Sequence, residues 1–320
     1  MSNSLKAILK IALPLLLGGV LVWYSLQKVP LSTLADYFKN ANYLWIGLGV
    51  FFGFLSHISR AYRWKFMIEP MGYTLRFPNS IMAVFAAYLI NYTIPRAGEV
   101  SRATILTNYE GVPFEKGFGT IVAERVADTL VMLIIIGITF IIEFDVIYNF
   151  FFADLNFKKQ WWVLASFVVV ACFIYLIFKK GTHPIINKLK TLFKGFLEGV
   201  LSIFKMKKKW AFIAHTIFIW GMYVLMFYVT SFSIDATSEL PFSAILIGFI
   251  AASFSIAATN GGIGSYPLAV YAAFSIFNVA QAPSLAFGWI MWASQTVMII
   301  ILGGLSLVSL PIYNKICPKR

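Results

Sequence analysis

The sequence predicts an all-α polytopic integral membrane protein, and three observations support this fold class. Hydrophobic residues make up 60% of the 320 residues, and charged residues make up only 12%. A soluble domain carries about 25% charged residues and cannot hide so much apolar surface in one core, which excludes the soluble globular and disordered classes. The third observation is that the apolar residues gather in runs long enough to cross about 30 Å of hydrocarbon.

About six of these apolar runs are long enough to be spanning helices. The first follows Lys6 and Lys10, as the apolar run of a signal peptide would, but it continues through Trp23 without a small-residue cleavage site, so we expect an uncleaved span. Two further apolar stretches, 79–94 and 243–258, are shorter and break off at prolines or glycines. The predicted spans are 7–26, 42–59, 117–142, 161–178, 210–231 and 283–309.

The distribution of charge predicts the topology. Lys and Arg total 26 against 13 acids, a net charge of +13. In a membrane protein, an excess of Lys and Arg marks the segments that lie on the cytoplasmic side. We therefore interpret the positive charge as topology and expect no nucleic-acid partner. Cations concentrate at the two termini and in two connections, including nine lysines between 179 and 209, whereas three other connections hold four lysines and six acids. We therefore expect both termini and the second connection (Arg60, Arg63, Lys65 and Arg76) inside, and 27–41, 143–160 and 232–242 outside.

This topology requires two segments to enter the membrane and turn back. If 79–94 crossed as one span, the nine-lysine loop would fall outside, so 79–116 must return to the side from which it came. The same reasoning applies to 243–282. The prediction is one membrane domain, 1–320, with about six spans and two re-entrant helical hairpins in an inverted-topology repeat of halves 1–150 and 160–320, as in many transporters. The alternative is seven or eight ordinary spans with an irregular charge bias.

The turn of the first hairpin carries charges at membrane depth. Pro95 is suited to start the returning helix, and Arg96, Glu99 and Arg102 follow at intervals of three, along one side of it. The helix N-terminus would point its free N–H groups into the membrane beside an arginine. This arrangement predicts an anion site.

The third span carries Glu124, Arg125 and Asp128. Glu124 and Asp128 share a helix face, and two carboxylates at that spacing repel unless a cation lies between them. A central ionised group costs about 2.5–3.5 kcal/mol in a spanning helix, so these residues need partners, for which Arg96 and Arg102 are candidates. We consider two interpretations: a closed ion-pair network that locks the hairpin to the span, or part of a polar pathway.

The second hairpin turns at a polar, glycine-rich segment. Ser265 is a suitable N-cap for a helix opened by Tyr266 and Pro267, and it would aim a second helix N-terminus into the membrane from the opposite leaflet. The two helix N-termini would together form a binding site for a headgroup phosphate inside the bilayer. The glycines are equally compatible with close helix packing alone. The candidate residues of this turn are Asn260, Gly261, Gly262, Gly264 and Ser265.

Residues 184–205 place apolar side chains at helical spacing among lysines. This pattern predicts an amphipathic helix on the inner leaflet, an anchor and topology determinant. Attraction of anionic inner-leaflet lipids is the alternative role.

Several motifs resemble one membrane family. Four motifs carry the resemblance: Arg60-Ala61-Tyr62-Arg63-Trp64, residues 95–102, residues 124–128 and the turn 261–264. They resemble the transmembrane flippase region of lysylphosphatidylglycerol synthases (multiple peptide resistance factors) and their stand-alone YbhN-like relatives, and the resemblance spans most of the chain. The resemblance implies a translocator in the bacterial plasma membrane for aminoacyl-phosphatidylglycerol-like or polyprenyl-phosphate-linked lipids, without the soluble synthase domain. One departure is Pro267, where the family commonly has an acidic residue.

Two other function classes compete with a lipid flippase. A membrane-embedded lipid-modifying transferase would use Glu99, Glu124 or Asp128 as a base, and a transporter of a small soluble anion would use the same helix termini. The sequence contains none of the common phosphate-loop, zinc-protease or serine-hydrolase motifs, so a non-enzymatic transporter is favoured. The cysteines and histidines are scattered, and we expect no metal and no cofactor, while homo-oligomerisation stays open.

Overall fold

Helices form every regular element in the part of the chain that this computed structural model describes, residues 3–144, 203 and 206–318. The first half contains α1 (Asn3–Lys28), α2 (Leu31–Asn40), α3 (Tyr43–Ile68), the 3-10 turn η1 (Glu69–Met71), α4 (Phe77–Thr93), α5 (Ala97–Glu110) and α6 (Phe114–Ile142). The second half contains α10 (Lys209–Ser231), α11 (Asp235–Ser238), α12 (Phe242–Ala258), α13 (Ser265–Ser275) and α14 (Gln281–Ile316). The predicted span 161–178 lies outside the described residues, as does the predicted helix 184–205 apart from Ile203.

The all-helical fold class is confirmed for these residues. Four helices are long and apolar enough to cross a membrane: α3 with η1, α6, α10 and α14. They coincide with the predicted spans 42–59, 117–142, 210–231 and 283–309, and α1 coincides with the predicted span 7–26. The shorter apolar stretches form α4 and α12. The total number of spans and the re-entrant course of the hairpins stay predictions.

Local residue chemistry explains several helix ends. Asn42 caps α3, because its side chain accepts a hydrogen bond of 3.1 Å from the N–H of Leu44. Helix α5 ends at Glu110, and Gly111 follows as its C-cap with a φ of 67°, left-handed backbone that glycine adopts without a Cβ penalty. Pro113 follows and sets the start of α6 at Phe114.

Helix α3 corrects one prediction. The predicted span stopped at residue 59, and its arginines were assigned to the inner connection. In the structure α3 continues to Ile68, and Arg60 and Arg63 are 2% and 0% exposed. The physical reason is that carboxylates of a neighbouring helix neutralise both guanidinium groups, which lets the apolar helix continue past them.

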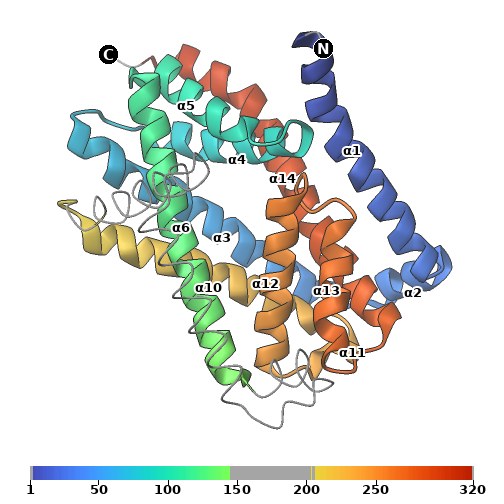
Figure 1. Cartoon of the computed structure of the whole chain (residues 1–320). Helices are drawn as coiled ribbons and strands as arrows, with labels where there is room; N and C mark the ends of the chain where they lie inside the picture. The colour runs from blue at the N-terminus through green and yellow to red at the C-terminus, as the bar shows by residue number, and fades with distance from the viewer. Residues whose placement is uncertain (1–2, 145–202, 204–205, 319–320) are drawn as a thin grey trace, which may run out of the picture.

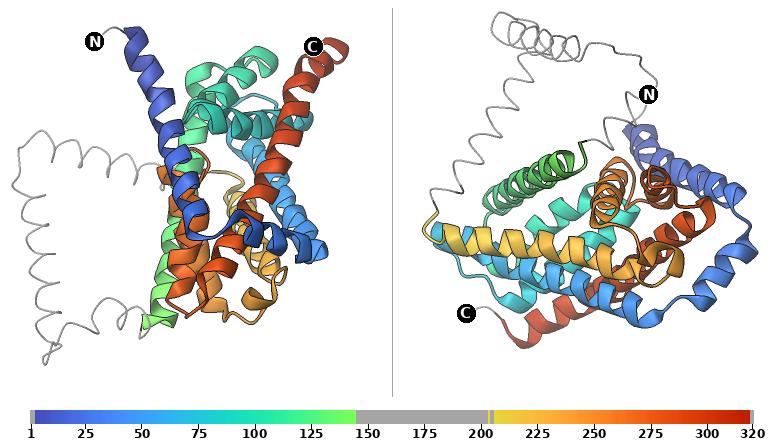
Figure 2. Two further views of the ribbon diagram at one scale, coloured as in Figure 1. Left: turned by 90° about the vertical axis from the view of Figure 1, so that its right-hand side faces the viewer. Right: turned by 90° about the horizontal axis from the view of Figure 1, so that it is seen from below.

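Two antiparallel helix pairs stand at opposite ends of the molecule. Helix α4 packs against α5, and α12 packs against α13. The α4–α5 pair lies towards the end that holds both chain termini, and the α12–α13 pair lies towards the end that holds α2 and α11 (Figures 1 and 2). The turns of the two pairs approach each other, since the ring of Tyr92 at the end of α4 lies directly against Gly261.

Two apolar clusters hold these elements together. One joins α10, α12, α13 and α14 through Phe227, Phe274 and Phe287, and the other joins α3, α5 and α6 through Trp64 and Ile121. Many large apolar side chains point outwards instead, such as Ile141, which is 78% exposed. An outer surface of this kind suits contact with lipid.

Candidate functional site

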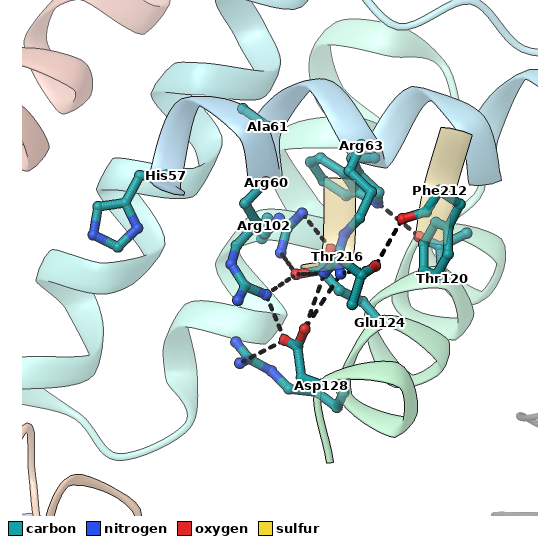
Figure 3. Close-up of polar contacts among 12 residues, drawn as sticks. His57, Arg60, Ala61, Arg63, Arg102, Thr120, Glu124, Asp128, Phe212 and Thr216 are labelled. Carbon is teal, nitrogen blue, oxygen red and sulfur yellow. Dashed lines mark hydrogen bonds and ion pairs between the residues drawn. The ribbon is translucent and has the colours of Figure 1, made fainter. Parts of the chain in front are cut away.

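Five ionised side chains form a buried cluster where α3, α5 and α6 meet (Figure 3). We call them the buried charge cluster. Their side chains are between 0% and 9% exposed. Burial of this degree is costly for a charge unless it is paired, so the contacts of each member decide what the cluster can do. The members are Arg60, Arg63, Arg102, Glu124 and Asp128.

Arg60 supplies the cation that the sequence requires between the two acids of α6. Its Nη1 lies 2.6 Å from Oε1 of Glu124 and 2.6 Å from Oδ2 of Asp128. Glu124 and Asp128 are one helical turn apart and point to the same side, towards α3. One guanidinium therefore relieves the repulsion between both carboxylates.

Arg63 and Arg102 complete the cluster from two directions. Nη2 of Arg63 lies 3.2 Å from Oδ1 of Asp128, and its Nη1 donates to Thr216 of α10 at 2.7 Å. Arg102 of α5 donates to both oxygens of Glu124, at 3.1 and 3.0 Å. Such a two-bond pair fixes both the position and the plane of the guanidinium.

Aromatic side chains enclose the arginines. The Arg102 guanidinium lies 4.0 Å from the ring centroid of Trp64, and the Arg63 guanidinium lies 4.9 Å from that of Phe212. Trp64 is itself fixed by a hydrogen bond of 2.8 Å to Thr120. The Nε atoms of Arg60, Arg63 and Arg102 are nevertheless buried without a hydrogen-bond partner among the described residues.

A partly exposed ion pair borders the cluster. Nη2 of Arg125 lies 3.2 Å from Oε1 of Glu99, and the two side chains are 44% and 23% exposed. Nη1 of Arg125 also lies 3.9 Å from Oδ2 of Asp128, so the pair is directly connected to the buried charges. We call Glu99 and Arg125 the rim pair.

Arg96 occupies the turn between α4 and α5. Its side chain is exposed and makes no ion pair among the described residues, and its φ of 61° is left-handed. The predicted pairing of Arg96 with the acids of α6 is therefore wrong, whereas the predicted pairing of Arg102 with Glu124 is confirmed. Arg96 lies in the turn that precedes α5 and not on the helix itself, so its side chain is not part of the cluster.

The start of α5 also differs from its prediction. The helix begins at Ala97 and not at Pro95. Two of its first N–H groups are already bonded, that of Ala97 to the carbonyl of Ile94 and that of Gly98 to the side chain of Asn91 at 2.7 Å. Fewer N–H groups are thus free for an anion than the sequence suggested.

The second predicted turn does not touch the buried charge cluster in the described part of the chain. Asn260 is 5% exposed and its Nδ2 has no partner there, while the carbonyl of Gly261 accepts a bond of 2.8 Å from Trp292. Gly262 and Gly264 have φ of 79° and 70°. Ser265 is not the N-cap of α13 as predicted. Gly264 takes that place, and the Ser265 hydroxyl lies 2.7 and 2.8 Å from those of Ser255 and Thr259.

Sequence reasoning missed Arg60 and Arg63 as site residues. A signal was available, because apolar residues resume at Trp64 and continue through Phe66, Met67 and Ile68. The spacing of three between the two arginines also places them on one side of a helix.

A second polar cluster joins the ends of α4, α5 and α14. Nε of Arg76 lies 3.0 Å from Oε1 of Glu110, to which Nδ2 of Asn79 donates at 2.6 Å. Nδ2 of Asn79 also donates to Asn314 at 2.9 Å.

The comparisons with known proteins give one family and one relative. The sequence pattern of the lysylphosphatidylglycerol synthase TM region matches residues 11–303. A UPF0104 membrane protein of Methanocaldococcus jannaschii is 25% identical over 310 residues, which cover 87% of this chain and 88% of the relative. No solved structure matches the chain significantly.

Proposed function

The chain belongs to the family of the lysylphosphatidylglycerol synthase TM region, and from this premise we propose that it translocates a phosphate-bearing lipid between membrane leaflets. The proposed substrates are aminoacyl-phosphatidylglycerol-like or polyprenyl-phosphate-linked lipids. The proposed location is the bacterial plasma membrane, with both termini in the cytoplasm. This assignment makes the chain a transporter and not an enzyme.

The excess of buried positive charge is the observation that carries the proposal. Among the residues that the structure describes, the buried charge cluster contains three guanidinium groups and two carboxylates, which leaves one positive charge uncompensated there. The rim pair is neutral, and Arg96 adds a second positive charge nearby. An ion-pair network that only locks helices together requires no excess of either charge. A lasting positive excess at membrane depth calls for an anion.

Helix lengths support the hairpin architecture. Helix α5 has 14 residues and α13 has 11, which correspond to about 21 and 16 Å at 1.5 Å per residue. Neither length crosses a hydrocarbon core of about 30 Å. In the proposed arrangement each pair enters the membrane and returns to the same side, and the two pairs form the corresponding parts of inverted halves.

The proposed path begins at the exposed cations. Arg96 and Arg125 first bind the lipid phosphate, which replaces Glu99 as the partner of Arg125. The buried charge cluster then attracts the phosphate further, since its arginines retain unbonded Nε donors. The acyl chains remain in the lipid throughout. An arginine suits this role because its planar fork binds a phosphate through two parallel hydrogen bonds.

A lipid-modifying transferase has one observation in its favour. Oγ of Ser59 lies 2.8 Å from Nδ1 of His215, a contact of the kind found between a nucleophile and its base. No carboxylate among the described residues bonds to His215, so the third member of a triad is missing there. Lipid transport therefore remains the function that the geometry supports best.

A protection assay in proteoliposomes tests this function. Headgroup-labelled phosphatidylglycerol is placed in the outer leaflet, and a membrane-impermeant reagent then destroys the label that is still outside. We expect the protected fraction to rise with time only when protein is present, with the mass of the lipid unchanged. A new lipid mass would instead identify a transferase. Efflux of entrapped phosphate without lipid protection would identify a solute carrier.

A further inference from the structure

An apolar groove of about 650 Å³ runs between α3 and α14. Its walls include Tyr43, Val50 and Phe54 of α3 and Val297 of α14, and Phe38 of α2 stands at one end. Both walls belong to helices that are long and apolar enough to span a membrane. The groove therefore opens towards hydrocarbon.

The length of the groove identifies its occupant. From Tyr43 to Phe54 the groove follows α3 for about 16 Å, at 1.5 Å per residue. That is about half of a hydrocarbon core of about 30 Å, the depth of one leaflet. A transmembrane helix of a second copy would require the whole thickness. We propose that the groove binds one acyl chain of a phospholipid from the leaflet on the α2 side.

This site is separate from the proposed translocation path. Trp292 and Thr296 of α14 point inwards, where they bond to Gly261 and Tyr92 at 2.8 and 3.1 Å. The groove residues Ser294 and Val297 stand on the far side of the same helix, since each residue turns the helix by about 100°. The bound lipid is thus a resident one that fills the space between α3 and α14, and it does not pass through the buried charge cluster.

The α2 end of the groove suits an anionic headgroup. Lys39 is exposed beside Phe38 and makes no ion pair among the described residues, although Asp36 lies one turn earlier on α2. The hydroxyl of Tyr43 donates to the carbonyl of Phe38 at 2.7 Å, which places an aromatic ring and a lysine at the same depth. That combination is typical of the boundary between hydrocarbon and headgroups. The ligand class is therefore an anionic phospholipid, with its phosphate near Lys39.

Gly47→Phe tests the site, because position 47 lines the groove and a Cβ there meets no atom within 4 Å. The matched control is Gly137→Phe on α6, where a Cβ also meets nothing. Native mass spectrometry of purified, washed protein counts the phosphatidylglycerol molecules retained per chain. We expect one phosphatidylglycerol molecule per chain in the wild type and in the control, and about tenfold lower occupancy in Gly47→Phe. The reason is that each acyl methylene group that the phenylalanine displaces from the groove loses its favourable burial.

Two further measurements keep the test decisive. Lys39→Gln should abolish the preference for phosphatidylglycerol over phosphatidylcholine while the chain stays bound. A phosphatidylglycerol with a photoreactive acyl chain should label peptides of α3 and α14 around Val50 and Val297 in the wild type. Equal retention by all variants together with labelling elsewhere would overturn the proposal. So would a dimer that Gly47→Phe separates into monomers, because a second copy would then occupy the groove.

Discussion

Arg60 shows how one residue allows two carboxylates to share a helix face inside the protein. Its contacts of 2.6 Å to both Glu124 and Asp128 replace the water that either acid would otherwise require. Arg63 and Arg102 add further pairs, and the cluster ends with more cations than acids. Removing an acid should therefore destabilise the protein more than removing an arginine.

A double-mutant cycle measures this asymmetry. Glu124→Gln leaves three arginines facing a single acid, and we expect a loss of about 3–5 kcal/mol, whereas Arg102→Met balances the charges and should cost less. The double variant should recover part of the loss caused by Glu124→Gln. Unfolding in mixed micelles gives the free energies. Equal and additive losses would show that the two groups do not interact.

The rim pair should influence which headgroup is accepted. Glu99→Gln releases Arg125 from its partner, which favours an anionic lipid over one with a cationic aminoacyl group. A partly exposed pair contributes about 0.5–1 kcal/mol, so the ratio of transport rates for phosphatidylglycerol and its lysyl ester should change by about two- to fivefold. Glu115→Gln, an exposed acid of α6, is the control. An unchanged ratio in both variants would remove Glu99 from the headgroup site.

At the scale of the helices, the sequence predicted much of the arrangement. Apolar length placed both ends of α6 and α10 and the start of α14 within a few residues of their observed bounds, whereas α14 continues past the predicted end at 309 to Ile316. The breaks at Pro95 and Asn260 indicated the positions of the two turns. The prediction failed where a distant partner decides the outcome. The extension of α3 past Arg60 depends on acids 64 and 68 residues away, which no local pattern contains.

The caps of α5 and α13 were unpredictable for a related reason. Asn91 bonds the N–H of Gly98 from the preceding helix, and Ser265 bonds other hydroxyls instead of its own helix. A polar side chain at a turn has several hydrogen-bond partners within reach, and the packing of the helix pair determines which of them it bonds.

Close packing of the helix pairs yields a stability prediction. A Cβ at Gly98 would collide with the carbonyl of Ala87, and one at Gly264 would meet the backbone of Leu21 and Val22. We expect Gly98→Ala and Gly264→Ala to destabilise the protein by about 1–3 kcal/mol. Gly119→Ala should have little effect, because a Cβ there meets nothing within 4 Å. Thermal unfolding in detergent compares the three. Equal melting temperatures would contradict the close approach.

At the scale of the whole molecule, the start of α1 and the end of α14 lie at the same end of the structure (Figure 2), and the inside location of that end stays a prediction from charge. The α4–α5 and α12–α13 pairs lie towards opposite ends of the structure (Figure 1), and their membership in inverted halves stays a prediction. The direction of the molecule in the membrane still rests on the distribution of lysines.

Single-cysteine labelling tests this orientation. In a background without Cys172 and Cys317, a cysteine at position 190 should react only from inside, and one at position 154 only from outside. The nine-lysine segment carries the first position and an acidic connection carries the second. The reverse labelling pattern would contradict the predicted inverted-topology repeat.

Transport by Arg96 variants is the most direct test of a phosphate-binding path. Arg96 is exposed and unpaired among the described residues, so Arg96→Ala should leave folding and insertion nearly intact. In the protection assay we expect this variant to lose lipid transport and Arg96→Lys to be impaired, because a lysine cannot form the two-bond phosphate contact. Lys116→Ala, another exposed cation, should transport normally. Full lipid transport by Arg96→Ala at wild-type levels of protein would contradict the phosphate path and leave the charges as a structural lock.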